Sequence, residues 1–360
     1  MINEKMKMKI KRMMHKLFSP IPHREGLGVS LFILLLFLAG CKTTSQKPTV
    51  DEQKPVSIMF IADSAYAFCQ KQCDFGPRTM NSEAHEKCAE WIRQKFEEFG
   101  YQVEMQKADV KGYDGTVLHA TNIIARGAKS EAQGTRARIL VCAHWDSRPW
   151  ADNDPDPANH HTPVMAANDG ASGVGVMLEL ARLIKQHGDS LNVDVDFVCF
   201  DAEDWGFPQW SEANDPGNTW ALGSQHWAAA YSQQQTADSP KYQYGILLDM
   251  VGGQGARFYQ ELMSKQYAGG IVDKVWAAAK VAGYGSVFPT EEGGGITDDH
   301  LPVNQVAGVP CIDIIPHYPE CRQSSFGSTW HTVSDDMAHL DRATLQAVGQ
   351  TMLQVLFSEK

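Results

Sequence analysis

The stretch that decides the fold reads Ile139-Leu-Val-Cys-Ala-His144-Trp-Asp146-Ser147. An apolar run of this length and branching is typical of a buried strand, and side chains two apart on a strand lie on the same face. His144 and Asp146 are therefore expected to leave the strand end together. Alone, such a pair is more typical of a strand end that satisfies its own hydrogen bonds than of a functional site.

A glycine-rich turn follows, Ala167-Asn-Asp169-Gly-Ala-Ser-Gly173, and leads into a segment expected to be helical over Val174–His187. The turn should expose the carboxylate of Asp169 just before the helix begins. With His144 and Asp146, three side chains that can bind a metal are thus predicted at one edge of a sheet.

The rest of the chain alternates predicted strands and helices, which indicates a sheet covered on both faces. We therefore predict an α/β fold, a three-layer αβα sandwich around a mixed, mostly parallel sheet. The glycines Gly293–Gly295 lack the Lys and the context of a phosphate loop, so we expect them to serve chain flexibility. Strands are predicted over Gln102–Lys107, His119–Ala125, Arg138–Ala143, Val193–Phe200, Tyr244–Val251 and Pro310–Ile315, and helices over Ser64–Gln72, Ser82–Phe99, Val174–His187, Gly223–Ser232, Gly270–Ala282 and Arg342–Phe357.

The amino-terminal segment reads as an export signal. A basic stretch precedes the apolar run Val29–Leu38, which is too short to span a membrane, and Leu38-Ala-Gly-Cys41 resembles a bacterial lipoprotein cleavage site. We expect residues 1–40 to be a lipoprotein signal peptide, residues 41–55 a polar tether and residues 56–360 a single domain. The protein would then be exported and anchored to a bacterial membrane through lipidated Cys41; a plain secretory signal is the alternative.

The net charge narrows the class of binding partner, and the cysteine count limits the disulfide pairing. The net charge of the chain is −11, and residues 1–40, with seven Lys or Arg and two Glu, contribute +5, so the mature part is near −16. Such a balance argues against nucleic acid as a partner. Beyond Cys41 there are seven cysteines, an odd number that leaves at least one unpaired even where disulfides are permitted.

Further acidic and imidazole side chains follow the other predicted strands. Glu203-Asp204 come after the strand that ends at Phe200, Asp249 lies near the end of the next strand, and His331 precedes the last helix. A turn adds Asp298-Asp299-His300. In open α/β sheets, ligands bind beyond the carboxyl ends of the strands, where all these groups are expected.

Taken in order, these motifs resemble those of the exopeptidase superfamily that holds zinc aminopeptidases and glutaminyl-peptide cyclotransferases, over nearly the whole mature domain. The resemblance implies that Asp169, Asp204 and His331 bind one Zn²⁺ and that Glu203 is the general acid and base. In two-zinc aminopeptidases the matches of His144 and Asp249 hold a second metal; the sequence does not count the ions.

Details near the carboxyl terminus favour the cyclase. Asp298 stands where aminopeptidases usually have Ser and cyclases an acid, and Trp330 directly precedes the metal-binding position, as in cyclases. Trp210 and Phe326 resemble the aromatic residues of the cyclase pocket, and Asp249 and Asp298 would share the proton of Glu203. We therefore predict a glutaminyl-peptide cyclotransferase acting on N-terminal glutamine of peptides and proteins.

Two alternatives stay open: a two-zinc aminopeptidase that removes N-terminal residues, and a surface binding module without catalytic activity. The chain also departs from the family. Asp204 replaces the glutamate that most members use as a ligand, Asp313 stands where animal cyclases commonly have His, and residues 317–325 are an insertion. These departures affect the expected rate and substrate preference more than metal binding.

Overall fold

The computed structural model describes residues 54–127, 137–211, 218–236 and 241–360. The predicted signal peptide, the lipidated Cys41 and residues 42–53 of the predicted tether lie outside the described residues, so they stay predictions. No helix among the described ranges is both long enough and apolar enough to cross a membrane.

A single six-stranded sheet organises the described chain, and its order is β1-β2-β4-β3-β5-β6. The strand β2 pairs antiparallel with both β1 and β4, whereas β3 pairs parallel with β4 and β5, and β5 with β6. The predicted mixed, mostly parallel sheet is confirmed. The strands are β1 (Gln102–Lys111), β2 (Val117–Arg126), β3 (Arg138–His144), β4 (Asp194–Phe200), β5 (Tyr242–Leu248) and β6 (Cys311–Ile314).

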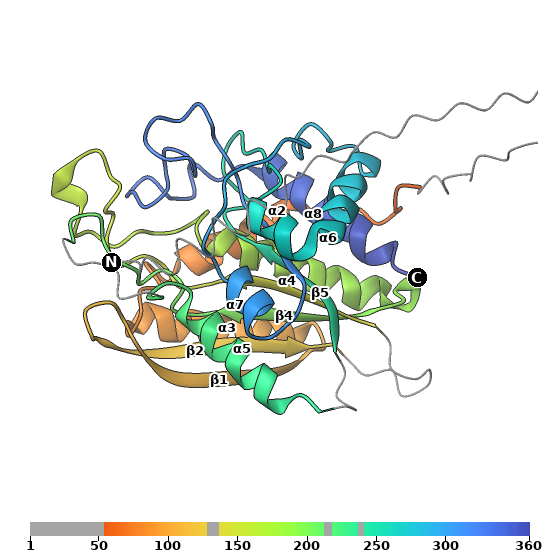
Figure 1. Ribbon diagram of the computed structural model, residues 1–360, viewed down its shortest axis with the longest axis horizontal. Coiled ribbons are helices and arrows are strands. Elements are labelled where there is room, and N and C mark those ends of the chain that lie inside the picture. Colours follow the sequence, from red (N-terminus) through yellow and green to blue (C-terminus); the bar gives the residue numbers. More distant parts are fainter. Residues whose placement is uncertain (1–53, 128–136, 212–217, 237–240) are drawn as a thin grey trace, which may run out of the picture. The chain divides into compact units, whose positions relative to one another are not determined.

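Helices cover both faces of this sheet, which confirms the three layers (Figure 1). Alternate residues of the central strands face opposite cores: Val141 of β3 belongs to the larger core, and Cys142 to the smaller one. The larger core lies under α2 (Ala62–Cys73), α3 (Glu83–Glu98), α4 (Ala171–His187), α6 (Leu262–Val281) and α8 (Arg342–Phe357), and the smaller under α5 (Leu222–Gln234) and the short α7 (His300–Gln305).

Two elements differ from their predicted bounds in ways that matter for function. The strand β5 ends at Leu248 rather than at residue 251, because Met250 has a positive φ of 52° and turns the chain. Asp249 is therefore the first residue past the end of β5, and its backbone N–H still bonds to the Ile314 carbonyl oxygen of β6. The helix α6 starts at Leu262, eight residues before the predicted start, because Glu261 caps it by accepting hydrogen bonds from the N–H groups of Met263 and Ser264.

Close packing explains two glycines of the turn before α4. A Cβ on Gly173 would lie 2.2 Å from the carbonyl oxygen of Leu248, so only glycine lets α4 approach β5 this closely. Gly170 has a φ of 100°, and a Cβ there would meet the Asp146 carbonyl oxygen at 2.7 Å. The turn is thus fixed tightly against the ends of β3 and β5.

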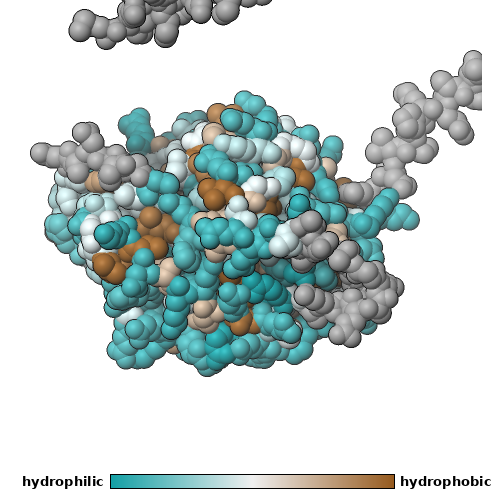
Figure 2. Space-filling model, turned by 60° about the horizontal axis from the view of Figure 1, so that its bottom comes forward, coloured by the Kyte–Doolittle hydropathy of each residue, from teal (hydrophilic) through white to brown (hydrophobic). Residues whose placement is uncertain are grey.

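Two further features concern the distribution of hydrophobic residues on the surface and the state of the cysteines. On the face in Figure 2, hydrophobic residues form small separate patches among hydrophilic ones. The seven cysteines beyond Cys41 are all free, and six of them are buried, including Cys142 and Cys199. Burial raises the pKa of both thiols well above the ordinary value, which disfavours the reactive thiolate.

Candidate active site

The acidic and imidazole side chains of the predicted constellation meet beyond the carboxyl ends of β3, β4 and β5. His144 is the last residue of β3, Asp204 follows β4, and Asp249 directly follows β5. Asp169 lies in the turn before α4, and His331 comes from the loop that precedes α8. All five side chains are buried.

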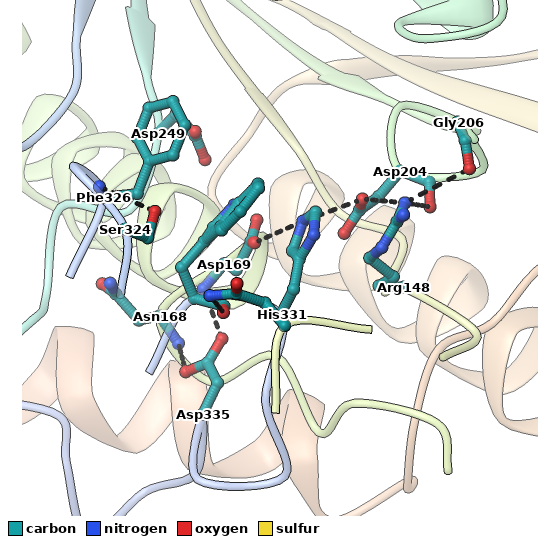
Figure 3. Close-up of polar contacts among 12 residues, drawn as sticks. Arg148, Asn168, Asp169, Asp204, Gly206, Asp249, Ser324, Phe326, His331 and Asp335 are labelled. Atoms are coloured by element: carbon teal, nitrogen blue, oxygen red, sulfur yellow. Dashed lines mark hydrogen bonds and ion pairs between the residues drawn. The ribbon is translucent and has the colours of Figure 1, made fainter. Parts of the chain in front are cut away.

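A first group consists of Asp169, Asp204 and His331, the predicted zinc ligands. Each offers one ligand atom within 4.8 Å of the others. Nε2 of His331 lies 3.2 Å from Oδ1 of Asp204 and 3.6 Å from Oδ2 of Asp169 (Figure 3). Among the described residues, the buried Oδ2 of Asp204 has no hydrogen-bond partner. Two carboxylates, one imidazole and an unpaired buried oxygen fit a catalytic Zn²⁺ that keeps a coordination position open.

A second group shares Asp169 with the first. Nε2 of His144 lies 2.9 Å from Oδ1 of Asp169 and 3.2 Å from Oδ1 of Asp249. These three residues also offer ligand atoms within 4.8 Å of one another. The predicted possible second metal site therefore has the required geometry, and its atoms already contact each other through short polar contacts.

Asp146 does not join either group, although its spacing with His144 suggested a ligand. Its carboxylate turns back and accepts hydrogen bonds from the backbone N–H of Glu203 at 3.1 Å and of Asp204 at 3.2 Å. Hydrogen bonds from His144 help to lower the pKa of Asp146 against the opposing effect of burial. Asp146 therefore positions the Glu203-Asp204 loop.

Asp335, which no motif of the sequence indicated, positions the turn that carries Asp169 in the same way. Its carboxylate accepts hydrogen bonds from the N–H of Asn168 at 2.8 Å and of Asp169 at 3.0 Å (Figure 3). Burial raises the pKa of Asp335 to about 7, and the Asp169 carboxylate adds to this effect. The only sequence signal was an acid four residues beyond His331.

Backbone strain concentrates around these groups. His331 has a φ of 54°, Ala202 before the Glu203-Asp204 pair has a φ of 51°, and Met250 after Asp249 has a φ of 52°. Non-glycine residues rarely adopt the left-handed region, and such outliers cluster at functional sites. Residues in this conformation flank or carry three of the five ligand positions.

Glu203 stands beside the first group and has the properties of a proton carrier. Its side chain lines the main cavity together with Asp169 and His331. Burial raises the pKa of Glu203 well above the ordinary carboxyl value, and nearby carboxylates, of which Asp204 and Asp298 are two, raise it further. A carboxyl group with a raised pKa can accept and return a proton near neutral pH.

The cavity at this site has a volume of about 440 Å³ and an aromatic wall. Phe326 and Trp330 line it as predicted, their ring centroids 5.0 Å apart, and Trp330 stacks on His331 at 3.7 Å. Asp249 and Asp298 also line it. The predicted catalytic carboxyls and two of the three predicted pocket aromatics therefore share one cavity.

Trp210 is a correction to the predicted pocket. It lies outside the cavity, with 40% of its surface exposed, and its ring packs 4.7 Å from that of His161. Trp220 lines the cavity instead, because the next residue, Ala221, donates a backbone hydrogen bond to the carbonyl oxygen of Glu203. Both tryptophans lie between β4 and α5, and the spacing did not indicate which one lines the cavity.

The glycine segment Gly293–Gly295 is a second finding that the sequence did not predict. These residues line the cavity, and hydrogen bonds fix them: Gly293 N–H donates to the Gln260 carbonyl oxygen, and the Gly294 carbonyl accepts from Leu262 N–H. The prediction that these glycines serve chain flexibility did not foresee that they line the cavity. Glycine here lets the backbone itself form a wall of the cavity. Tyr259, Glu261, Thr297 and His317 complete this side.

A third buried group lies behind Asp298. Asp298, His300 and Asp313 offer ligand atoms within 4.8 Å of one another, and both ring nitrogens of His300 lack hydrogen-bond partners among the described residues. Burial raises the pKa of both Asp298 and Asp313. The Asp249 carboxylate raises the pKa of Asp298 further, and Asp298 and Asp249 raise that of Asp313 further. Neutral carboxyl groups are the form in which such acids can lie close together.

Solved structures of known proteins resemble this chain over almost their whole length. A glutaminyl cyclase of Bacteroides thetaiotaomicron, bound to N-acetylhistamine, is 47% identical, with a TM-score of 0.78 over 84% of this chain and 99% of that one. A structure described as a leucine aminopeptidase precursor from the same organism is also 47% identical, with a TM-score of 0.77 over 85% and 100%.

Among curated proteins, aminopeptidase YwaD of Bacillus subtilis is 26% identical over 226 residues, 61% of this chain, and the glutaminyl-peptide cyclotransferase of Bos taurus 26% over 250 residues, 62% of this chain. The chain spans 40% and 62% of the length of these two relatives. The model of peptidase family M28 matches residues 122–356, which include every ligand position described above. The chain therefore belongs to peptidase family M28.

Proposed function

We propose that this protein is a zinc-dependent glutaminyl-peptide cyclotransferase, which converts N-terminal glutamine of peptides and proteins to pyroglutamate and releases ammonia. One observation carries the proposal: Glu203, a partly buried carboxyl with a raised pKa, opens onto the same cavity as Asp169 and His331 of the first ligand group and the aromatic wall. The 47% identity to a glutaminyl cyclase over 84% of this chain supports it.

The reaction closes a ring within the substrate. The α-amine of the N-terminal glutamine attacks its own γ-carbonyl carbon, a C–N bond forms, and the bond to the amide nitrogen breaks to release ammonia. Glu203 would take a proton from the attacking amine and return it to the departing nitrogen, so the carboxyl ends as it began. Its raised pKa suits both transfers.

Asp169, Asp204 and His331 would hold the metal. When bound, Zn²⁺ would supply a Lewis acid that polarises the γ-carbonyl group. Trp220, which stacks over His331 at 6.2 Å, and the Phe326 wall would confine the glutamine side chain and exclude water. Confinement favours the internal nucleophile over hydrolysis.

Asp249 and Asp298 would assist Glu203 from the same cavity. Burial and then Asp249 raise the pKa of Asp298 well above the ordinary value, which favours the protonated form that can donate a hydrogen bond. A neutral Asp298 beside the ionised form of Glu203 can share the transferred proton. We infer that Glu203 and Asp298 pass the transferred proton between them and that Asp249 shares it.

A two-zinc aminopeptidase is the second candidate, because the group of His144, Asp169 and Asp249 also has ligand geometry. The mass of the product separates the two. Purified protein incubated with a Gln-initiated peptide should lower the peptide mass by one ammonia and leave every residue in place. Loss of the first residue would instead establish the aminopeptidase.

We further propose that one zinc ion is bound per chain, in the first group, with the second group closed by the contacts of His144. Metal analysis of the purified protein tests this: one zinc ion per chain is expected, and two would favour the aminopeptidase. Removal of His144 should leave that ion in place.

Finally, we propose that the protein is exported and anchored to a bacterial membrane through lipidated Cys41. The support is in the sequence alone: the basic start, the apolar run Val29–Leu38 and the residues Leu38-Ala-Gly before Cys41. Cys41→Ser should move the protein from the membrane fraction to the soluble fraction. Unchanged fractionation of this variant would contradict the anchor.

A further inference from the structure

One arginine beside the first ligand group has no role in the chemistry described so far. Arg148 is completely buried, and its guanidinium forms a double hydrogen bond with Asp152, with both N···O distances at 2.7 Å. The same guanidinium donates to Oδ1 of Asp204 at 3.1 Å (Figure 3). It also donates to the carbonyl oxygens of Asp204, at 3.2 Å, and Phe207, at 3.1 Å. Arg148 thus fixes both the side chain and the loop of one ligand.

Its partner Asp152 reaches a second ligand. Oδ1 of Asp152 lies 3.4 Å from Nδ1 of His331, whose Nε2 faces Asp169 and Asp204. A carboxylate at Nδ1 favours the tautomer with the proton on Nδ1 and leaves the Nε2 lone pair free for a metal. The pair Arg148–Asp152 therefore contacts two of the three ligands without belonging to the group.

The arginine also connects the ligands to the cavity wall. Its guanidinium lies 4.8 Å from the ring of Trp220, which lines the cavity, and 5.3 Å from the ring of Trp150. The guanidinium thus makes a cation–π contact with each ring. A displacement of Arg148 would therefore move the Trp220 wall as well as Asp204.

The geometry at Asp204 shows why its contact with Arg148 matters for metal binding. Arg148 and His331 occupy the space around Oδ1, and Oδ2 is the atom without a hydrogen-bond partner among the described residues. An aspartate pinned at one oxygen presents the other in a single direction. The charge of Asp152 is balanced by Arg148, so the second carboxylate adds no net charge beside the ligands.

We propose that Arg148 is a positioning residue for zinc, which aims Oδ2 of Asp204 directly and Nε2 of His331 through Asp152. This inference rests on the proposed zinc site, and it concerns affinity for the metal rather than the proton transfers. Residues that orient ligands in this way typically change metal affinity by about 10- to 100-fold when removed.

The experiment measures the zinc dissociation constant by competition with a chelator, together with the melting temperature of the metal-free protein. Arg148→Met and Arg148→Lys are the test variants, and Arg138→Met is the matched control. Arg138 is also a buried arginine, paired with Asp196 at 2.6 Å, but it lies at the opposite end of β3. The lysine variant keeps a buried cation, so it reports on positioning if the methionine variant does not fold.

Both Arg148 variants are expected to weaken zinc binding about 10- to 100-fold. Methionine has no hydrogen-bond donor, and the single ammonium of lysine cannot reach Asp152 and Asp204 at once. Arg138→Met should lower the melting temperature and leave the zinc dissociation constant within about twofold. Wild-type affinity in both Arg148 variants, or an equal loss in Arg138→Met, would overturn the inference. Absence of zinc binding by the wild-type protein would instead overturn the proposed function and this inference with it.

Discussion

Each end of the paired strands β3 and β4 has a buried aspartate paired with an arginine, but the two aspartates differ in how fully their oxygens are hydrogen-bonded. At the amino end, Asp196 accepts hydrogen bonds from Arg138 at 2.6 Å, from Gly127 N–H at 2.9 Å and from the Tyr242 hydroxyl at 2.9 Å. At the carboxyl end, Asp204 is paired with an arginine too, yet its Oδ2 has no partner among the described residues.

The difference shows how function is distinguished from structure within one sheet. A buried carboxylate with both oxygens hydrogen-bonded, as in Asp196, stabilises the fold and has no unpaired oxygen to offer a ligand. A buried carboxylate with an unoccupied oxygen carries a free-energy cost that a bound cation removes. The carboxyl end also holds the left-handed residues Ala202, Met250 and His331, whereas no such residue lies near Arg138 along the described chain.

The largest effect should follow from removing a ligand at the carboxyl end. His331→Ala is expected to release the zinc ion and to lower kcat/KM by about 10⁴-fold or more, beyond the effect of any single proton-transfer group. Metal analysis of the purified variant, beside the ammonia-release assay, checks both. Unchanged zinc content would place the metal elsewhere.

Glu203→Gln should separate proton transfer from metal binding. The variant keeps the shape of the side chain and is expected to lose about 10²- to 10⁴-fold in kcat while retaining its zinc. Because burial and the neighbouring carboxylates raise the pKa of Glu203, wild-type kcat/KM should rise with pH through that raised pKa as the base loses its proton. A Gln variant with full rate would show that Glu203 is not the acid and base.

At the amino end, Asp196→Ala should affect stability and not chemistry. It leaves the buried Arg138 without its main partner, which typically costs about 3–5 kcal/mol of the free energy of unfolding. Urea unfolding measures the loss, and zinc content and kcat of the folded fraction should match the wild type. A variant as stable as the wild type would remove the distinction between the two ends.

The smallest effects concern the pocket aromatics. Phe326→Ala should raise KM for a Gln-initiated peptide about tenfold, the size expected for losing about 1.4 kcal/mol of aromatic contact. Trp210→Ala, outside the cavity, should change KM by less than about twofold. A larger effect of Trp210 than of Phe326 would return Trp210 to the substrate pocket.

Elements with a clear period or cap were predictable from the chain alone. The closing helix α8 has the predicted bounds, Arg342–Phe357, and the buried strand at Ile139 lies in the middle of the sheet. The helix α6 was predicted to begin at Gly270, whereas it begins at Leu262 and has a non-helical residue, Ala268 (φ −142°, ψ 39°), just before the predicted start. A mixed, mostly parallel sheet was predicted, but nothing local indicated that β2 would be the strand that joins two antiparallel pairs.

The sequence by itself determined which residue types stand after each strand, because a buried strand must deliver its next residues to the sheet edge. The assignment of Asp169, Asp204 and His331 as zinc ligands came from the resemblance of the ordered motifs, and it stays a proposal. Only the tertiary structure decided the orientation of each side chain. It turned Asp146 back onto a backbone loop, placed Trp220 rather than Trp210 in the wall, and brought Arg148 onto Asp204. The physical reason is that hydrogen-bond partners and cavity walls are set by contacts between distant loops, for which the spacing of residues along the chain has no local signal.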